Sequence, residues 1–495
     1  MKDQSAAQLS RMRVTAGSET SSATTATASK ASSEAAPSAI SLAAANRILL
    51  SLMLPSMLMP MLSSMSRVAL PIVRNDFQIA ADMTAWVDSV FTLPFMFLML
   101  VYGRLSDAVG RRRLILIGIV IFTIGTIMTL WAPSLAWLMA GRAIQGCGVA
   151  GMMPLGMALI SSIFPTKERG KALGTWSTVG PTTGFVSPLL AGFLVDHWGW
   201  RAAYAPPLLV AVLAFVVVSR FVPSGLSKVQ PHFWRSFDWG GVLLLAGAMT
   251  SLLFFLSSRP ITGVEPLQDW RLGLLMVIFF GAFLLWEWWR QNPFVDFAIF
   301  TSRMFTVASS CGALRMVVMA GQGFIIPLYL VDVHGFTAAY IGSVTMISAG
   351  TMSLIVRFGG QLADRWGSRW PTVIGIGVQG GVMLVFAFFP ASAPIWAIAV
   401  VLGIYGLGAG LVLAALHRAA VGQMEKEQIG TATGLYSMIR FVGAMIGTAL
   451  GGVILQHYLD QSLPVVAAYQ QVFLFFAGMG LLGSLLGFTL REPRR

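Results

Sequence analysis

Charged side chains are scarce in this sequence. Asp, Glu, Lys and Arg make up 11% of the 495 residues, whereas 56% of the residues are hydrophobic. Soluble globular proteins carry roughly 25% charged residues, which cover the surface that faces water. A chain with less than half of that share cannot present a water-compatible surface over most of its area. The scarcity of charge therefore excludes an ordinary soluble protein and indicates a membrane protein.

Cysteine and histidine are scarce as well. The two cysteines, Cys147 and Cys311, lie in apolar runs and lack the clustering and spacing of disulfide frameworks and metal sites. The five histidines are dispersed, and neither HExxH nor Gly-x-Ser-x-Gly occurs in the sequence. We therefore expect no enzyme activity, no metal and no cofactor.

The sequence has instead a series of apolar segments of roughly 20 residues, which are long enough to cross a bilayer as helices. A strand of a membrane barrel would show only about 10 alternating residues, so the run lengths indicate helices. The predicted spans are 47–72, 84–102, 113–131, 135–163, 172–194, 203–222, 239–258, 271–289, 304–329, 338–360, 370–389, 393–418, 430–456 and 468–490.

The net charge of +13 comes from Lys and Arg in alternate short loops, whereas the intervening loops, such as 132–134, are nearly uncharged. By the positive-inside rule both termini are cytoplasmic. Basic residues placed this way orient the chain in the membrane and do not indicate nucleic-acid binding. Residues 1–45, rich in Ser, Ala and Thr, are predicted to form a disordered cytoplasmic tail.

The chain contains an internal repeat. The loop Gly103–Arg113 reads GRLSDAVGRRR, and the loop Gly360–Arg369 reads GQLADRWGSR, with Gly, Leu, Asp and Gly recurring at an offset of 257 positions. Two related halves that hold substrate between them are a common plan of transporters. The first loop follows the second span and the other follows the tenth, so two extra helices must lie between two six-helix halves.

The repeat therefore predicts an N-terminal half at 46–222 and a C-terminal half at 303–495. Residues 223–302 form a linker and an extra two-helix hairpin. The expected fold class is an all-α polytopic membrane protein with two pseudo-symmetric halves and two extra central helices.

Several motifs resemble those of the major facilitator superfamily. Gly103–Arg113 is similar to its signature loop, Arg142–Gly148 to its fourth-helix motif, and Ser187–Gly192 to its fifth-helix antiporter motif. Trp86–Asp88 and Asp238–Gly240 resemble the fourteen-helix drug:proton antiporter branch. The resemblance covers nearly everything after the tail, and it implies a proton-coupled exporter of amphipathic or hydrophobic small molecules that works by alternating access.

The sequence also departs from the branch. Ser187 and Ala191 replace glycines of the antiporter motif, and in the first helix Leu62 stands where an acidic residue belongs and Arg67 where an Asn belongs. These departures keep an alternative open, in which the protein is a facilitator or a specific carrier of an anionic or lipid-like solute.

Asp88 and Arg142 are the candidate proton-coupling residues, because a charged residue inside a membrane span is costly and is usually functional. Both lie about two turns inside their spans. A carboxylate held by the helix dipole, or an arginine that caps carbonyl groups, would be the structural alternative. The resemblance implies that Arg142 takes part in proton coupling.

Arg142, Gln145, Arg315 and Arg440 are the predicted substrate-cavity residues, since Arg315 and Arg440 also fall near the middle of spans. Arg67 is closer to an outer end, so we expect its side chain to extend to the lipid headgroups.

The repeated loops are predicted to form a gate whose contacts exist in one access state and break in the other. Asp107 would meet a helix N-terminus, while the arginines would meet carboxylates or headgroups. The predicted gating residues are Gly103, Asp107, Gly110, Arg111, Arg112, Gly360, Asp364, Gly367 and Arg369. A hinge in the fifth span is predicted at Gly180, Pro181, Gly184, Pro188 and Gly192.

The expected partners are a small-molecule substrate, protons and membrane lipids, with no nucleic acid. We expect a monomer that is integral to the plasma membrane, which in a bacterium is the inner membrane.

Overall fold

The computed structural model describes residues 41–224, 237–290, 295, 297–424 and 428–490, without the side chains of Asp107, Thr166, Lys167 and Arg357. Met1–Ala45 and Asn46–Arg495 are separate structural units. The predicted tail at 1–45 lies almost wholly outside the described residues, as does much of the predicted linker that follows the first half.

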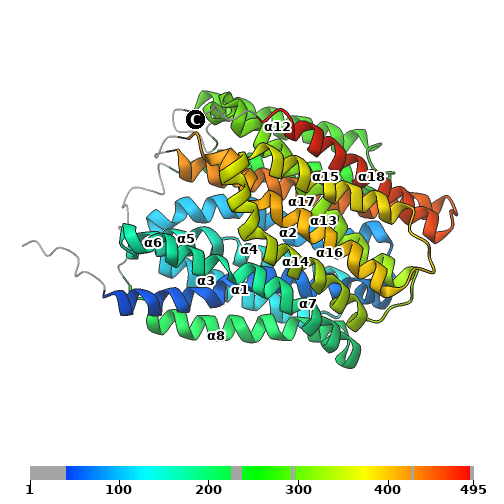
Figure 1. Ribbon diagram of the computed structural model, residues 1–495, viewed down its shortest axis with the longest axis horizontal. Helices are drawn as coiled ribbons and strands as arrows, with labels where there is room; N and C mark the ends of the chain where they lie inside the picture. Colours follow the sequence, from blue (N-terminus) through cyan, green and yellow to red (C-terminus); the bar gives the residue numbers. More distant parts are fainter. Residues whose placement is uncertain (1–40, 225–236, 291–294, 296, 425–427, 491–495) are drawn as a thin grey trace, which may run out of the picture. The chain divides into compact units, whose positions relative to one another are not determined.

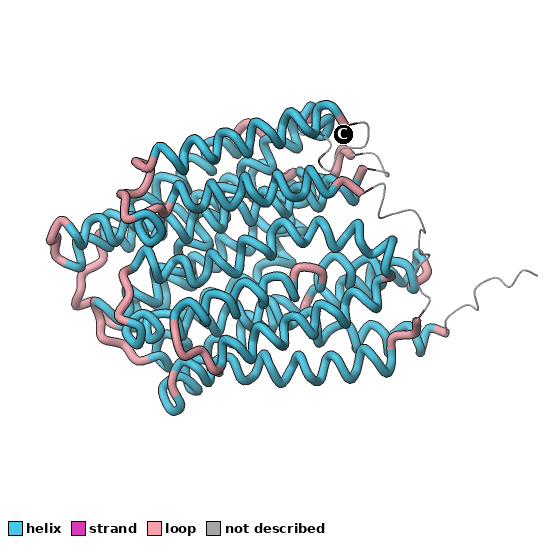
Figure 2. Tube along the Cα trace, turned by 180° about the vertical axis from the view of Figure 1, so that it is seen from behind, coloured by secondary structure: helices cyan, strands magenta, loops and turns pink. Residues whose placement is uncertain are grey.

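Every predicted span is confirmed as helical (Figures 1 and 2), although the spans 135–163 and 172–194 are each divided into two helices. Within the described part of the chain, fourteen helical stretches are long and apolar enough to cross a membrane. The elements are α1 (Leu42–Phe77), α2 (Ala81–Val109), α3 (Arg111–Leu130), α4 (Leu135–Val149), α5 (Met152–Ile163), α6 (Thr166–Ser177), α7 (Val179–Trp198), η1 (Trp200–Tyr204), α8 (Ala205–Phe221), α10 (Trp239–Leu256), α11 (Arg259–Thr262), α12 (Trp270–Trp289), η2 (Phe297–Thr301), α13 (Arg303–Asp332), α14 (Ala338–Trp366), α15 (Arg369–Ala387), α16 (Ile395–Val421), α17 (Ile429–Asp460) and α18 (Val465–Gly487).

Proline affects two of these spans differently. Helix α1 runs for 36 residues, ten more than predicted, and contains Pro55, Pro60 and Pro71 without a break. The predicted span 172–194 is longer than expected and is divided into α6 and α7 at Thr178. Pro181 explains the division, because its ring replaces the N–H that would bond to the carbonyl of the fourth residue before it, Ser177.

The extra hairpin packs where the two halves meet. Helix α10 contacts α2 of the N-terminal half and α17 of the C-terminal half, whereas α12 packs mainly on α10. Trp86 of α2 donates its indole N–H to Ser257 Oγ at 2.9 Å and stacks near Phe254 at 5.3 Å between ring centroids. Asp238 caps the start of α10 by accepting the N–H of Gly241 at 3.0 Å. The Trp86 and Asp238 motifs therefore fasten the hairpin.

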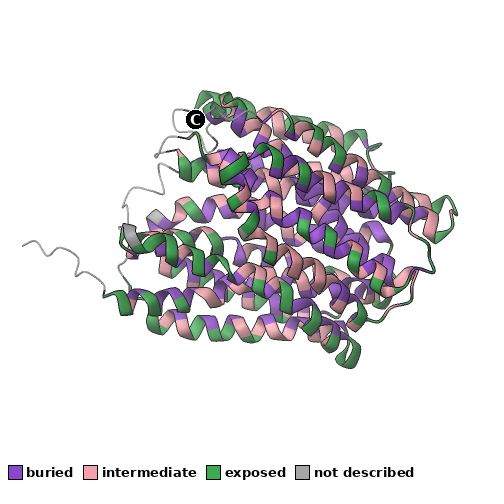
Figure 3. Ribbon diagram, in the orientation of Figure 1, coloured by how far each residue is buried: buried purple, intermediate pink, exposed green. Residues whose placement is uncertain are grey.

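The two halves meet through two helix pairs, α2 with α17 and α14 with α7. Buried residues concentrate where these helices face one another, while exposed residues follow the outer faces of helices such as α8 (Figure 3). A Cβ atom at Gly192 of α7 would lie 2.4 Å from the carbonyl oxygen of Ala338, and one at Gly452 of α17 would lie 2.7 Å from that of Ala81. Only glycine permits both approaches.

These two contacts are images of each other under the repeat. Ala338 follows Ala81 by 257 positions, and Gly452 follows Gly192 by 260. Hydrogen bonds repeat as well: the carboxylate of Asp196 accepts the N–H groups of Ala338 and Ala339 at 2.8 and 2.9 Å.

Gln456, 260 positions after Asp196, accepts the N–H of Ala81 in the same way, at 2.9 Å. Each half thus supplies a side chain that satisfies an orphan N–H at the start of a helix in the other half.

Valine at Gly192 or Gly452 should destabilise the protein by about 1–3 kcal/mol each, because its side chain would overlap the facing backbone. Thermal unfolding of the purified protein measures this effect. Gly381→Val is the matched control, since no atom lies within 4 Å of a Cβ built at Gly381. Equal losses in all three variants would show that helix propensity, and not the contact between halves, sets the stability.

Candidate functional site

Asp88 and Arg142 form an ion pair inside the N-terminal half. Arg142 Nη2 lies 3.2 Å from Asp88 Oδ1, and the arginine is fully buried while Asp88 is 7% exposed. The rest of the guanidinium is also used: Nε donates to the carbonyl oxygen of Val87 at 3.2 Å, and Nη1 donates to Gln145 Oε1 at 3.1 Å. The ring of Phe91 lies 4.6 Å from the guanidinium carbon.

The glycines of the fourth-helix motif bring this pair together. A Cβ atom at Gly146 would lie 2.2 Å from the carbonyl oxygen of Phe91 on α2, and one at Gly148 would lie 2.4 Å from the backbone nitrogen of Phe122 on α3. Helix α4 therefore packs closely against both neighbours. Gln145 completes the arrangement by donating from Nε2 to Thr126 Oγ1 at 3.2 Å.

The charge of Arg142 is balanced by the carboxylate of Asp88 alone among the described side chains. A buried charge that loses its partner costs about 3–5 kcal/mol. Protonation of Asp88 removes the charge that balances Arg142, so the arginine must then find another partner or rearrange. The pair is therefore suited to convert binding of a proton into a structural change.

Arg315 of α13 and Arg440 of α17 form a second group, in the C-terminal half. Arg315 is 2% exposed and donates from Nη2 to the carbonyl oxygen of Ala409 at 3.0 Å. Both guanidinium groups contact the same sulfur atom, Met316 Sδ, at 3.9 Å. Arg440 also lies over the ring of Tyr436, 5.4 Å from its centroid.

The direction of the Arg67 side chain differs from the prediction. Arg67 was predicted to extend to the lipid headgroups, but its side chain lies against α13, where a Cβ atom at Gly323 would be 2.5 Å from Arg67 Nη1. The glycine makes room for an arginine that crosses from the N-terminal half to the C-terminal half. No pattern in the sequence around Arg67 shows that Gly323 faces it.

The first repeated loop uses backbone acceptors. Arg111 Nη1 donates to the carbonyl oxygen of Ala158 on α5 at 3.0 Å, and Arg112 Nη2 donates to that of Ser219 on α8 at 2.7 Å. The prediction that these arginines meet carboxylates or headgroups is not tested by these hydrogen bonds and stays a prediction. Gly110 adopts φ +91° between α2 and α3, a conformation that favours glycine. The side chain of Asp107, predicted to meet a helix N-terminus, lies outside the described residues.

The second repeated loop places its carboxylate against an arginine. Asp364 Oδ1 accepts a hydrogen bond from Arg418 Nη1 at 2.8 Å. Arg418 lies in the last turn of α16 and is one of the basic residues whose placement in the sequence was interpreted only as an orientation signal. Gly367 adopts φ +74°, a positive value like that of its counterpart Gly110 in the first loop. Arg369 lies over the rings of Trp370 and Phe488.

The first glycines of the two loops, Gly103 and Gly360, lie near the ends of α2 and α14. No atom is within 4 Å of a Cβ built at Gly103, and the nearest atom to one at Gly360 is 3.7 Å away. Neither position is held by a close helix contact in this structure.

The predicted hinge residues of the fifth span separate into two kinds. Pro188 and Gly192 lie in the contact with α14, where Pro188 faces Gly342. No atom lies within 4 Å of a Cβ built at Gly180 or Gly184. The break between α6 and α7 lies at Thr178, just before Pro181, and the hinge stays a prediction.

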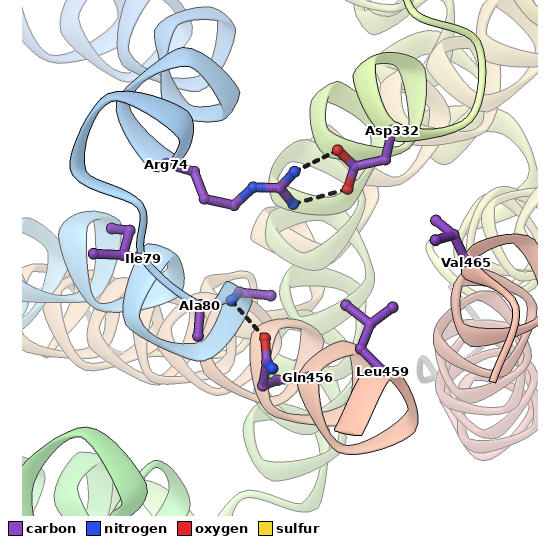
Figure 4. A pocket seen from close by; sticks show the side chains of 8 residues that line it. Arg74, Ile79, Ala80, Asp332, Gln456, Leu459 and Val465 are labelled. Carbon is purple, nitrogen blue, oxygen red and sulfur yellow. Dashed lines mark hydrogen bonds and ion pairs between the residues drawn. The ribbon is translucent and has the colours of Figure 1, made fainter. Parts of the chain in front are cut away.

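A cluster that the sequence did not single out lies at the far end of α1 from the tail. The guanidinium of Arg74 binds both carboxylate oxygens of Asp332 of α13, and Tyr469 of α18 donates its hydroxyl to the same carboxylate at 2.6 Å. A cavity of about 390 Å³ lies beside this ion pair, with Gln456 and Val465 among the residues that line it (Figure 4). We name Arg74, Asp332 and Tyr469 the outer latch, because the orientation predicted from the loop arginines puts this end outside the cytoplasm.

The repeat contained a signal for the outer latch. Arg74 and Asp332 are 258 positions apart, which is close to the offset of the repeated loops. They therefore occupy equivalent ends of the first helix of each half, and a pseudo-two-fold axis brings such ends together. A search for opposite charges at the repeat offset would have found them.

The family model described as Major Facilitator Superfamily matches residues 52–309 and 308–495. Among curated relatives, Multidrug resistance protein Stp of Mycobacterium tuberculosis is 29% identical over 402 residues, which are 80% of this chain and 73% of the relative. The riboflavin transporter RibZ of Clostridioides difficile is 26% identical over 386 residues, 78% of this chain and 83% of the relative.

The solved structure of a mutant of the peptide transporter POT in complex with sulfate has a similar fold. Its TM-score is 0.65 at 14% sequence identity, over 89% of this chain and 93% of that one. The fourteen apolar helices and the family match together indicate an integral membrane transporter of small molecules, not an enzyme. The chain belongs to the major facilitator superfamily.

Proposed function

We propose that the protein is a proton-coupled exporter of amphipathic or hydrophobic small molecules that works by alternating access of its two halves. The observation that carries this proposal is the buried pair of Asp88 and Arg142. The permanently charged arginine and the carboxylate lie 3.2 Å apart and are almost closed to solvent. When such a carboxylate binds a proton, the ion pair is lost, so proton binding changes the interactions of the arginine.

The position of Asp88 links the proton to the contact between the halves. Ala81, Ala85 and Asp88 follow one another at spacings of four and three residues, so they lie along one face of α2. Ala81 and Ala85 contact α17 at Gly452. Asp88, on the same helix α2, is bound by Arg142 of α4. Protonation of Asp88 would remove one of the contacts that hold α2 to α4, while the hydrogen bond from Arg142 to the carbonyl of Val87 remains, and this change would alter how α2 meets α17.

In the proposed mechanism the outer latch is formed in the cytoplasm-facing state, in which the outer end of the protein is closed. Arg74–Asp332, Asp196 with the start of α14, and Gln456 with the start of α2 all join the two halves near the same end. Rocking of the halves must break these contacts before an exported substrate can leave through the outer end. Their replacement by contacts of the repeated loops would close the cytoplasmic end.

The even number of spans among the described residues supports termini on the same side, and the loop arginines support the cytoplasm as that side. The proposal therefore includes the plasma membrane, the inner membrane in a bacterium, as the location, with a monomer as the transporting unit. The relative named as a multidrug resistance protein supports export. A relative named as a riboflavin transporter supports an amphipathic aromatic solute as one class of substrate.

Asp88→Asn should abolish substrate-driven proton movement while it keeps the shape of the pair. Asparagine accepts a hydrogen bond from Arg142 but cannot carry a proton. The measurement uses liposomes that contain the purified protein and a pH-sensitive dye, with an imposed proton gradient. Ethidium, Nile red and dansylglycine represent the cationic, neutral and anionic amphiphiles. The wild type should move protons when a transported probe is added, and the variant should match empty liposomes.

The control is Asp82→Asn, a buried carboxylate on the same helix that accepts the N–H of Met83 at 2.7 Å and takes no part in the Asp88 pair. It should retain proton flux. Flux that persists in Asp88→Asn would contradict the coupling assignment. Movement of a probe without any proton flux in the wild type would identify a facilitator.

Asp332→Asn should favour the outward-open state, because it removes the charge that Arg74 binds. If the ion pair stabilises the cytoplasm-facing state by about 1–2 kcal/mol, its removal shifts the equilibrium between the two access states by about 5- to 30-fold. A cysteine at Ala81, which is 2% exposed, reports opening through its rate of labelling by a membrane-impermeant thiol reagent in a background without Cys147 and Cys311. The labelling rate should rise by about that factor.

Asp76→Asn is the matched control, because Asp76 pairs with Arg201 within the N-terminal half, at 3.4 Å. This variant should label at the wild-type rate. Equal acceleration in both variants would mean that any loss of charge at this end loosens the protein, and that the Arg74–Asp332 pair is not a gate.

A further inference from the structure

Three arginines without an acidic partner among the described residues lie in the C-terminal half or against it. Arg67 of α1, Arg315 of α13 and Arg440 of α17 come from three helices, and no Asp or Glu of the described residues lies within ion-pair distance of any of them. Arg142, by contrast, is balanced by Asp88 at 3.2 Å. The interior of the C-terminal half therefore carries positive charge that the described side chains do not neutralise.

The contacts that these arginines do make are weak. Arg315 and Arg440 share the thioether sulfur of Met316 as an acceptor at 3.9 Å, and thioether sulfur is a poor acceptor. The Nε atoms of all three arginines are buried without a hydrogen-bond partner. Arg315 has one good acceptor, the carbonyl oxygen of Ala409. A cation buried as deeply as Arg315, which is 2% exposed, needs a counter-charge, because an unpaired ion inside a membrane protein is costly.

The titratable groups around the arginines supply no negative charge. Tyr405 and Tyr436 interact electrostatically with Arg315, and His417 interacts with Arg440. Phenols and imidazoles are not anions at neutral pH. The hydroxyl of Tyr405 is itself buried without a partner, so it remains free to donate a hydrogen bond.

An apolar cluster lies directly beside the two guanidinium groups. Met316, Ala320 and Ala444 form its buried part, and Met319 and Phe441 pack against it. Phe441 also meets Phe95 of α2, at 4.8 Å between ring centroids, across the boundary between the halves. Methionine side chains are flexible and polarisable, so they adapt to apolar ligands of different shape.

We propose that Arg315 and Arg440 bind the acidic group of an amphipathic organic acid, and that Met316, Met319 and Phe441 contact its apolar body. This inference rests on the proposed transport function, whose substrate class it narrows to compounds with a carboxylate or a similar anionic group. Arginine suits this role because its planar donors match the geometry of a carboxylate. An inorganic anion could supply the same charge, so the experiment includes both sources.

The experiment measures equilibrium binding to the purified full chain in detergent. The probe pair is dansylglycine and its amide, which share the aromatic body and differ in the carboxylate. The acid should bind about 10- to 100-fold more tightly than the amide, as expected for buried hydrogen bonds between charged groups. Arg315→Gln and Arg440→Gln should reduce the preference to near unity, while Arg440→Lys should retain part of it.

Arg440 is only half-buried, so its variants keep the test valid if Arg315→Gln fails to fold. Arg271→Gln is the matched control, because Arg271 is exposed and its guanidinium lies near the ring of Trp270, at 5.9 Å. This control should keep the preference for the acid. Equal binding of acid and amide by the wild type would overturn the inference, and so would a preference that survives both glutamine variants.

Benzoate, chloride and inorganic phosphate serve as competitors. Displacement of dansylglycine by benzoate at concentrations where chloride and phosphate have no effect supports an organic acid as the ligand. Displacement by chloride or phosphate alone would overturn the inference in favour of an inorganic anion site. Because binding is measured without a proton gradient, failure of the Asp88→Asn flux test leaves its result unaffected. Absence of acid preference together with normal coupling would reject this inference and retain the proposed function.

Discussion

A charged side chain inside a bilayer must be paired, hydrated or neutralised, and the interior of this protein is organised around that constraint. The N-terminal half meets it internally, with Asp88 against Arg142 at 3.2 Å. The C-terminal half leaves Arg315 and Arg440 with sulfur and carbonyl acceptors. In the proposed mechanism a proton changes the charge balance of Asp88 and Arg142, and a bound solute changes that of Arg315 and Arg440. Both changes occur in helices, α2 and α17, that meet at the boundary between the halves.

The repeat separates scaffold from chemistry. At the contacts between the halves the equivalence is close: Gly192 faces Ala338 as Gly452 faces Ala81, and Asp196 caps α14 as Gln456 meets the start of α2. These positions serve packing and helix ends, which both halves need. The charges of the interior do not repeat, since Thr345 stands 257 positions after Asp88 and Ala399 stands 257 after Arg142. Shared geometry with unequal charge fits the proposed mechanism, in which two similar halves rock about one coupling site.

Much of the fold could be predicted from the sequence, because the length of an apolar run decides whether a helix crosses a bilayer. Asp88 and Arg142 could be selected for the same reason, since charge is rare in such runs. Local patterns did not reveal contacts between distant segments. The position of Arg67 depends on the missing side chain of Gly323 on another helix, and Arg418 gains meaning only when Asp364 lies 2.8 Å away. The outer latch was within reach, because its two charges stand at the repeat offset.

In the proposed mechanism the carboxyl group of Asp88 gains and loses a proton while it faces Arg142. Difference infrared spectroscopy of the protein in lipid bilayers observes this group directly, through the C=O stretch of a protonated carboxylic acid. We expect a band that appears as the pH is lowered, weakens when a transported substrate binds, and is missing in Asp88→Asn. A spectrum in which the titrating carboxyl bands are the same in the wild type and in Asp88→Asn would contradict this mechanism.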